Sequence, residues 1–134
     1  MYPLLKLLHI LSSTVLFGTG LGTAFAMWRA NATGDARVIA VVARNVVLAD
    51  WLFTSPAVIV QPVTGILLTR ELGYPITTPW LVATLALYAL AGLCWVPVVG
   101  LQLKMRDLAT QASHTGTPLP TAYHRHFRRW FALG

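Results

Sequence analysis

The chain has 134 residues, short enough for a single domain, and 56% of them are hydrophobic while only 10% are charged. Soluble domains carry about a quarter charged residues, so this composition excludes an ordinary soluble fold, which would expose large apolar patches to water. A net charge of +6 could indicate a nucleic-acid partner, but the basic residues lie between apolar segments instead of in one patch. We therefore expect an all-α polytopic membrane protein whose basic loops face a lipid bilayer, with no nucleic-acid partner.

The first predicted spanning helix covers residues 4–28, an apolar segment interrupted only by Lys6 and His9. It is longer than the roughly 20 residues needed to cross a hydrocarbon core. A cleavable signal peptide would be shorter and would end in small residues, whereas this segment ends at Trp28 and Arg29. We interpret it as a retained helix.

The second predicted span covers residues 46–69. A polar loop is expected from Arg29 to Arg37, and a helical pattern resumes at Val38 and leads into this span. Pro56 and Pro62 lie inside it. A proline removes a backbone hydrogen bond and kinks a helix, which membrane bundles tolerate when a neighbouring group satisfies the freed carbonyl.

The third predicted span covers residues 79–103 and begins at Pro79, a residue suited to the first position of a helix. A loop rich in Ser, Thr, Gly and Pro is expected at residues 112–121. The final segment, residues 122–134, combines arginines with aromatic residues, a pattern typical of a helix entering the membrane. We expect this interfacial segment to lead into a fourth span after residue 134; the alternative is a short amphipathic helix on the membrane surface.

The distribution of basic residues predicts the orientation of the chain. Only Lys6 and Arg70 lie on the side of the N-terminus. The other side holds the remaining basic residues, namely Arg29, Arg37, Arg44, Lys104, Arg106, Arg125, Arg128 and Arg129. By the positive-inside rule, we expect an outside N-terminus and cytoplasmic loops after the first and third spans.

His9 is the strongest candidate for chemistry, because it is the only histidine inside a predicted span. Ionisable residues within a membrane often mark function, and a neutral imidazole is a good ligand for haem iron. Ser13 and Gly20 share its side of the helix, and Gln61 lies at a comparable depth, so these residues could line a pocket for haem b. The alternative is that His9 hydrogen-bonds a neighbouring helix or lies in the headgroup layer.

Several small or cyclic residues are candidates for helix packing. Gly18 and Gly22 form a small-xxx-small pair, which allows another helix or a flat cofactor to approach closely. The surrounding glycines resemble a dinucleotide fingerprint only superficially, because no strand precedes them. Pro56, Pro62 and Gly65 are the further positions where we expect helices to dock.

Asp50 is a carboxylate within the second span that could relay protons or pair with a basic residue such as Arg44 or Arg29. Arg44 and Asp50 are six residues apart and do not share a helix face, which favours a partner on another helix. We favour a structural ion pair. The histidines outside the spans have no cysteine or carboxylate cluster beside them and are not expected to bind a metal: His114, His124 and His126.

Three runs of sequence resemble a family of predicted bacterial integral membrane proteins, domain-of-unknown-function family 2269: Leu4–Ile10, Ala49–Ala57 and Tyr123–Gly134. The resemblance covers essentially the whole chain. It implies a multi-pass protein of the bacterial inner (cytoplasmic) membrane and supports a fourth helix after residue 134, because members of the family typically continue there.

A more distant similarity is to the bacterial membrane protoporphyrinogen oxidase of the HemJ type. The Lys-x-x-His start of that family's first helix is matched by Lys6 and His9, and its Thr-Pro-Ala motif is approximated by Ser55–Ala57, followed by Gly65. The similarity implies that His9 binds haem b. The family's lysine early in helix three has no counterpart here, where Trp80, Leu81 and Thr84 stand.

These observations leave three functional hypotheses. The first is a haem b-binding protein or subunit that moves electrons in the outer half of the bilayer, with His9 as an axial ligand. The second is a cofactor-free structural or assembly subunit that docks other membrane proteins or associates with itself. The third is an enzyme resembling protoporphyrinogen oxidase.

Overall fold

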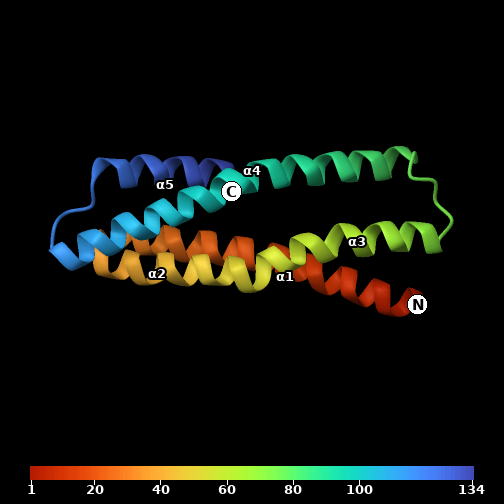
Figure 1. Cartoon of the computed structure of the whole chain (residues 1–134), viewed down its shortest axis with the longest axis horizontal. Helices are drawn as coiled ribbons and strands as arrows, with labels where there is room; N and C mark the ends of the chain where they lie inside the picture. The colour runs from red at the N-terminus through yellow and green to blue at the C-terminus, as the bar shows by residue number, and fades with distance from the viewer.

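The computed structural model describes all 134 residues and contains helices as its only regular secondary structure (Figure 1). The elements are α1 (Tyr2–Thr33), α2 (Ala36–Ala49), the π-helical turn η1 (Asp50–Thr54), α3 (Ser55–Glu71), α4 (Pro79–Thr115) and α5 (Thr121–Leu133). Because α2, η1 and α3 follow one another without a break, they form one long helix. Three helices are long and apolar enough to cross a membrane: Tyr2–Thr33, Ala36–Glu71 and Pro79–Thr115. The prediction of an all-α bundle with three spanning helices is confirmed.

The connections between helices are shorter than the sequence predicts. The loop expected from Arg29 to Arg37 is reduced to Gly34 and Asp35. Gly34 ends α1 in the left-handed conformation with φ of 66°, which glycine adopts without steric cost. The carboxylate of Asp35 accepts a hydrogen bond of 2.8 Å from the backbone N–H of Arg37 and caps α2. A single left-handed residue and a cap are therefore enough to reverse the chain.

Helix α4 begins with Pro79 in its first turn, as expected, but it continues to Thr115, well past the predicted end of the span at residue 103. The predicted start of the following loop, at residue 112, is therefore wrong, because the loop begins only after Thr115. The helix ends at Gly116, which has φ of 65°. Figure 1 shows α4 changing direction in the middle of its length, and Pro97 is its internal proline.

The helices pack in antiparallel pairs along the long axis of the molecule (Figure 1). Helix α1 packs against α3 near the end that carries Met1 and Tyr74, and against α2 near the opposite end, where Gly34 lies. We call these the Met1 end and the Gly34 end. Helix α4 packs against α2, and α5 runs back along α4. Neither α1 nor α3 packs extensively against α4.

One hydrophobic core lies in the half near the Gly34 end, where four helices come together. Its buried residues are Met27, Ala30, Ile39, Ala40, Ala43, Val46, Val98, Met105, Ala109, Tyr123 and Trp130. The half near the Met1 end contains only α1, α3 and the first part of α4. Most large apolar side chains there are exposed, as expected for surfaces that face lipid tails.

Residues 122–134, predicted to be interfacial, form most of α5, which is part of the packed core. Tyr123 is fully buried, and its hydroxyl donates a hydrogen bond of 2.9 Å to Oδ1 of Asn31 at the end of α1. Burial raises the pKa of Tyr123 to about 12, and the hydrogen bond with Asn31 partly opposes this change. The polar tip of α5 is thus tied to α1, while Trp130 anchors its other end in the core.

Candidate functional site

His9 lies at the centre of a hydrogen-bond network that joins α1 to α3. Its Nδ1 is 2.9 Å from Oγ1 of Thr64, and its Nε2 is 3.2 Å from the amide nitrogen of Gln61. The Gln61 carbonyl oxygen accepts a hydrogen bond from the hydroxyl of Ser12, one turn along α1 from the histidine. Because Ser12 and Thr64 are buried, the network lies between the two helices and not on the lipid-facing surface.

The donors and acceptors of this network are mutually consistent. An amide nitrogen can only donate, so Nε2 of His9 accepts from Gln61 and the ring carries its proton on Nδ1. Nδ1 then donates to Oγ1 of Thr64, whose own hydrogen is directed to the backbone carbonyl of Val60 at 2.7 Å. Both ring nitrogens therefore have partners on α3, which agrees with the alternative in which His9 hydrogen-bonds a neighbouring helix.

Gly65 provides the space that the imidazole occupies. A Cβ atom built on Gly65 would lie 3.1 Å from Cε1 of His9, closer than most real Cβ contacts. The ring of His9 therefore packs directly on the backbone of α3 at this position. The group that approaches Gly65 is thus a side chain of α1 and not the backbone of a second helix.

Of the four residues proposed to hold a cofactor, the structure brings only His9 and Gln61 together. The hydroxyl of Ser13 donates to the carbonyl of Ile10 in its own helix, and Gly20 lies farther along α1 in a separate cleft. The predicted serine was Ser13, at i+4 from His9, whereas Ser12, at i+3, contacts Gln61. Both spacings lie on one side of a helix, and the position of α3 decides between them.

The arrangement around His9 does not fit an axial haem ligand. Iron coordination through Nε2 would displace the amide of Gln61, and coordination through Nδ1 would displace Thr64. His9 does not line the large cleft described below, and no histidine or methionine lines it. No group of three or more His, Cys, Asp or Glu side chains in the chain is arranged to hold a metal ion.

Pro62 produces a second contact between helices. The ring of Pro62 lacks an N–H, so the carbonyl of Val58, four residues earlier, loses its helical donor. The hydroxyl of Tyr88 on α4 donates a hydrogen bond of 2.8 Å to that carbonyl. The expectation that a neighbour satisfies the carbonyl freed by a proline is confirmed at this position. Pro56, by contrast, is exposed and docks no helix within the chain.

Asp50 does not form the ion pair that the sequence analysis favoured. Its side chain is only 6% exposed, and its Oδ1 accepts a hydrogen bond of 2.7 Å from the hydroxyl of Thr54. Arg44 is exposed on α2, and the single ion pair of the structure joins Arg106 to Asp107. Asp50 is therefore a buried carboxylate with no cation beside it, in a segment long and apolar enough to cross a membrane.

The π-helical turn at Asp50–Thr54 explains how this carboxylate is positioned. The backbone N–H of Ser55 bonds the carbonyl of Asp50, five residues back, and the Ser55 hydroxyl donates to the same carbonyl at 3.0 Å. Single π-helical turns of this kind occur frequently at functional sites. Nothing in the residue pattern of this segment signals such a turn.

A cleft of about 740 Å³ opens between α1 and α4, beyond the end of α5. Its walls are mainly apolar, and its polar lining comes from Thr23, Asp50, Thr54, Tyr88 and Gln102. Gln102 is only 6% exposed, and its amide makes no hydrogen bond within the chain. Trp130, at the same end of the cleft, has a buried indole N–H that also lacks a partner.

The two glycines predicted to dock a helix do not do so within this chain. A Cβ atom at Gly18 or Gly22 would meet nothing within 4 Å, and both residues are exposed. Gly20, by contrast, lines the cleft together with Ala24, so a different small-xxx-small pair of α1 faces the open space between helices.

The fold and these contacts define a polytopic helical membrane protein. A family model described as "Predicted integral membrane protein (DUF2269)" matches residues 3–134, and the chain belongs to this family. The resemblance found in the sequence is therefore confirmed over nearly the whole chain. No curated protein and no solved structure matches, so the similarity to protoporphyrinogen oxidase stays a prediction.

Proposed function

We propose that the protein is a cofactor-free membrane subunit that docks a transmembrane helix of another membrane protein in the cleft between α1 and α4. The observation that carries the proposal is a gap in the helix packing in the middle of the molecule, beyond the end of α5. There α4 has no extensive contact with α1 or α3, and a cleft of about 740 Å³ separates α4 from α1.

The walls of the cleft have the periodicity of helix surfaces. Five of the nine lining residues on α4 follow intervals of three and four, namely Leu87, Ala91, Cys94, Val98 and Gln102. At 1.5 Å per residue this stripe is ~22 Å long, about four helical turns. On the other wall, Gly20 and Ala24 reduce the bulk of α1, which permits the close interaxial distance of packed membrane helices. A groove of this length and shape suits a helix better than a compact ligand.

The polar end of the cleft specifies what the partner helix carries. The carboxylate of Asp50 accepts one hydrogen bond, from Thr54, and has no cation, while the Gln102 amide has no partner. Leaving such groups facing lipid tails is costly. We therefore expect an apolar partner helix with one basic or hydrogen-bond-donating side chain at the level of Asp50.

The network around His9 supports the cofactor-free form of the proposal. Its hydrogen bonds fasten α1 to α3 and leave neither ring nitrogen free for a metal. These two helices thereby form a rigid wall beside the cleft. A role in electron transfer would require a cofactor ligand that these contacts do not supply.

The single cysteine of the chain provides a direct test, because Cys94 lines the cleft. A photo-crosslinker attached to Cys94 in native membranes is expected to label a transmembrane peptide of another protein, identified by mass spectrometry. The matched control is Leu93→Cys in a Cys94→Ser background. Leu93 has the same depth but is 72% exposed outside the cleft, so it should label lipid.

Asp50→Leu is expected to reduce the protein adduct at Cys94, because the substitution removes the group that recognises the partner's polar side chain. Adducts only with lipid, or only with another part of the same polypeptide, would contradict docking of a partner helix. An equal yield of the same protein adduct from Leu93→Cys would contradict docking in the cleft.

We also propose that the Gly34 end faces the cytoplasm of a bacterial inner membrane, since eight of the ten basic residues are on the predicted cytoplasmic side. Reporter fusions at Gly34 and Gly73 should then give opposite sidedness. The same sidedness at both positions would overturn this orientation.

A further inference from the structure

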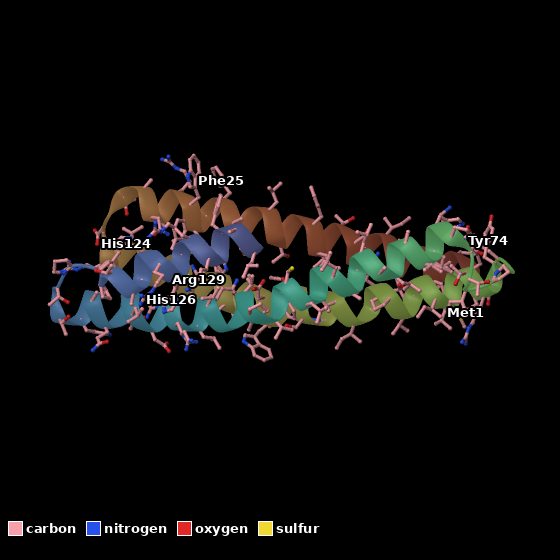
Figure 2. All side chains as sticks on the ribbon, turned by 90° about the horizontal axis from the view of Figure 1, so that it is seen from above. Met1, Phe25, Tyr74, His124, His126 and Arg129 are labelled. Carbon is pink, nitrogen blue, oxygen red and sulfur yellow. The ribbon has the colours of Figure 1, made fainter.

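We propose that Lys104, Arg125, His126 and Arg129 form a binding site for the phosphate of an anionic phospholipid headgroup. The site joins two elements, because Lys104 belongs to α4 and the other three residues belong to α5, which packs against it. Figure 2 shows His126 and Arg129 close together along α5, far from Met1 and Tyr74 at the opposite end.

The fold gathers like charges at this site. Arg125 and Arg129 are four residues apart on one face of α5, a spacing at which like charges destabilise a helix. Lys104 lies on α4, the helix that packs against α5. Burial and the charges of Lys104, Arg125 and Arg129 together lower the pKa of His126. The Nδ1 atom of His126 is buried without a hydrogen-bond partner.

No acidic residue of the chain forms an ion pair with these side chains. There are only four Asp and Glu residues in the sequence. Asp107 pairs with Arg106, Asp35 caps α2, and Asp50 lies in the cleft with Thr54. Glu71 ends α3 at the Met1 end of the molecule. Asp107 is three residues from Lys104 but pairs with Arg106, so none of the four cationic or titratable side chains of the site has an ion-pair partner within the chain.

The position of the site favours a lipid over a free anion. Lys104 directly follows the apolar stretch of α4 that ends at Leu103, so it lies at the depth where headgroups begin. Aromatic residues of α5 flank the basic ones: Phe127 stacks on Trp130, and Phe131 is 55% exposed. Basic groups bordered by aromatic side chains match the boundary between phosphate and acyl chain.

The test measures the affinity of the whole protein in detergent for short-chain phosphatidylglycerol, short-chain phosphatidylcholine and inorganic phosphate. We expect phosphatidylglycerol to bind tightest. Lys104→Gln with Arg129→Gln should weaken its binding roughly twentyfold, about fivefold for each cation removed. The matched control, Arg37→Gln with Arg128→Gln, removes the same charge at exposed positions outside the site and should change the affinity by less than about twofold.

Three outcomes would overturn the site. Equal losses in both double variants would indicate diffuse attraction between the lipid and the net charge. If phosphatidylcholine bound as tightly as phosphatidylglycerol, the site would not require an anionic lipid. If inorganic phosphate bound as tightly, the site would recognise the phosphate group without the rest of the lipid. The single variants Lys104→Gln and Arg129→Gln, each expected to lose about fivefold, provide the same test should the double variant fail to fold.

Discussion

Replacing His9 by alanine removes the ring that fastens α1 to α3. Two hydrogen bonds between the helices are lost, one to Thr64 and one to Gln61. Such bonds between membrane helices contribute on average ~0.6 kcal/mol and at most ~1.7 kcal/mol each. The substitution also leaves the Gln61 amide without its acceptor and empties the space above Gly65. We expect the free energy of unfolding to fall by about 2–3 kcal/mol.

The assay is reversible unfolding of the purified protein in mixed detergent micelles, followed by circular dichroism. Ser13→Ala is the matched control, because its hydroxyl bonds only the carbonyl of Ile10 in its own helix. The control should lose less than about 0.5 kcal/mol. A double-mutant cycle between His9→Ala and Gln61→Ala should give a coupling energy of about 0.5–1.5 kcal/mol.

Two results would refute the reasoning about His9. Strict additivity of His9→Ala and Gln61→Ala would mean that the two side chains do not interact in the folded protein. A Soret band in protein from haem-replete cells that disappears in His9→Ala would mean that the histidine binds haem iron, contrary to the cofactor-free proposal.

Three further predictions test other contacts. Gly65→Ala should lower the free energy of unfolding by about 1 kcal/mol, because its methyl group meets the imidazole, while Gly18→Ala should be neutral or slightly stabilising in the same unfolding assay. Tyr88→Phe should lower the free energy of unfolding by about 1 kcal/mol, because the hydrogen bond to the Val58 carbonyl is lost. In a Pro62→Ala background the loss should be much smaller, because a backbone N–H at position 62 again reaches that carbonyl. Equal losses in both backgrounds would contradict this contact. Because the pKa of Tyr123 is raised to about 12, ionisation of the unfolded chain should reduce stability from pH 10 upward, by about 2–3 kcal/mol at pH 12. Tyr123→Phe should remove this decline in unfolding scans between pH 9 and 12, and an unchanged decline would exclude Tyr123 as its cause.

Several features of the fold were predictable because they depend on local chemistry. The three spans follow from apolar runs that are long enough to cross a hydrocarbon core. Pro79 marks the start of α4, because the backbone N–H that proline lacks has no hydrogen-bond partner in the first turn of a helix. The loops were harder to bound. Arg29 and Ala112 were assigned to loops, but each helix continues past them. Each helix ends only at a glycine with φ near +65°.

The candidate site was only partly predictable. His9 and Gln61 were expected at a comparable depth as the lining of a pocket, and the structure joins them by a hydrogen bond instead, since helices that cross the same bilayer bring equal depths together. The choice between Ser12 and Ser13 depends on the rotation of α1 about its axis, which helix packing sets. Asp50 was expected to form an ion pair with a basic residue on another helix. In the structure its carboxylate instead accepts a hydrogen bond from Thr54, at the other end of the π-helical turn.

The sequence by itself determined that the chain is a helical membrane protein, where its spans lie, and that a histidine and a carboxylate lie within them. These properties follow from hydropathy, which each residue carries whatever its neighbours are. Only the tertiary structure decided which groups meet: His9 with Gln61 and Thr64, Tyr88 with the carbonyl freed by Pro62, and Asp50 with an open cleft. Lipid tails are as apolar as the side chains that face them, so hydrophobicity does not select how membrane helices rotate and pair. Close packing and a few hydrogen bonds make that selection, and they exist only once the helices are assembled.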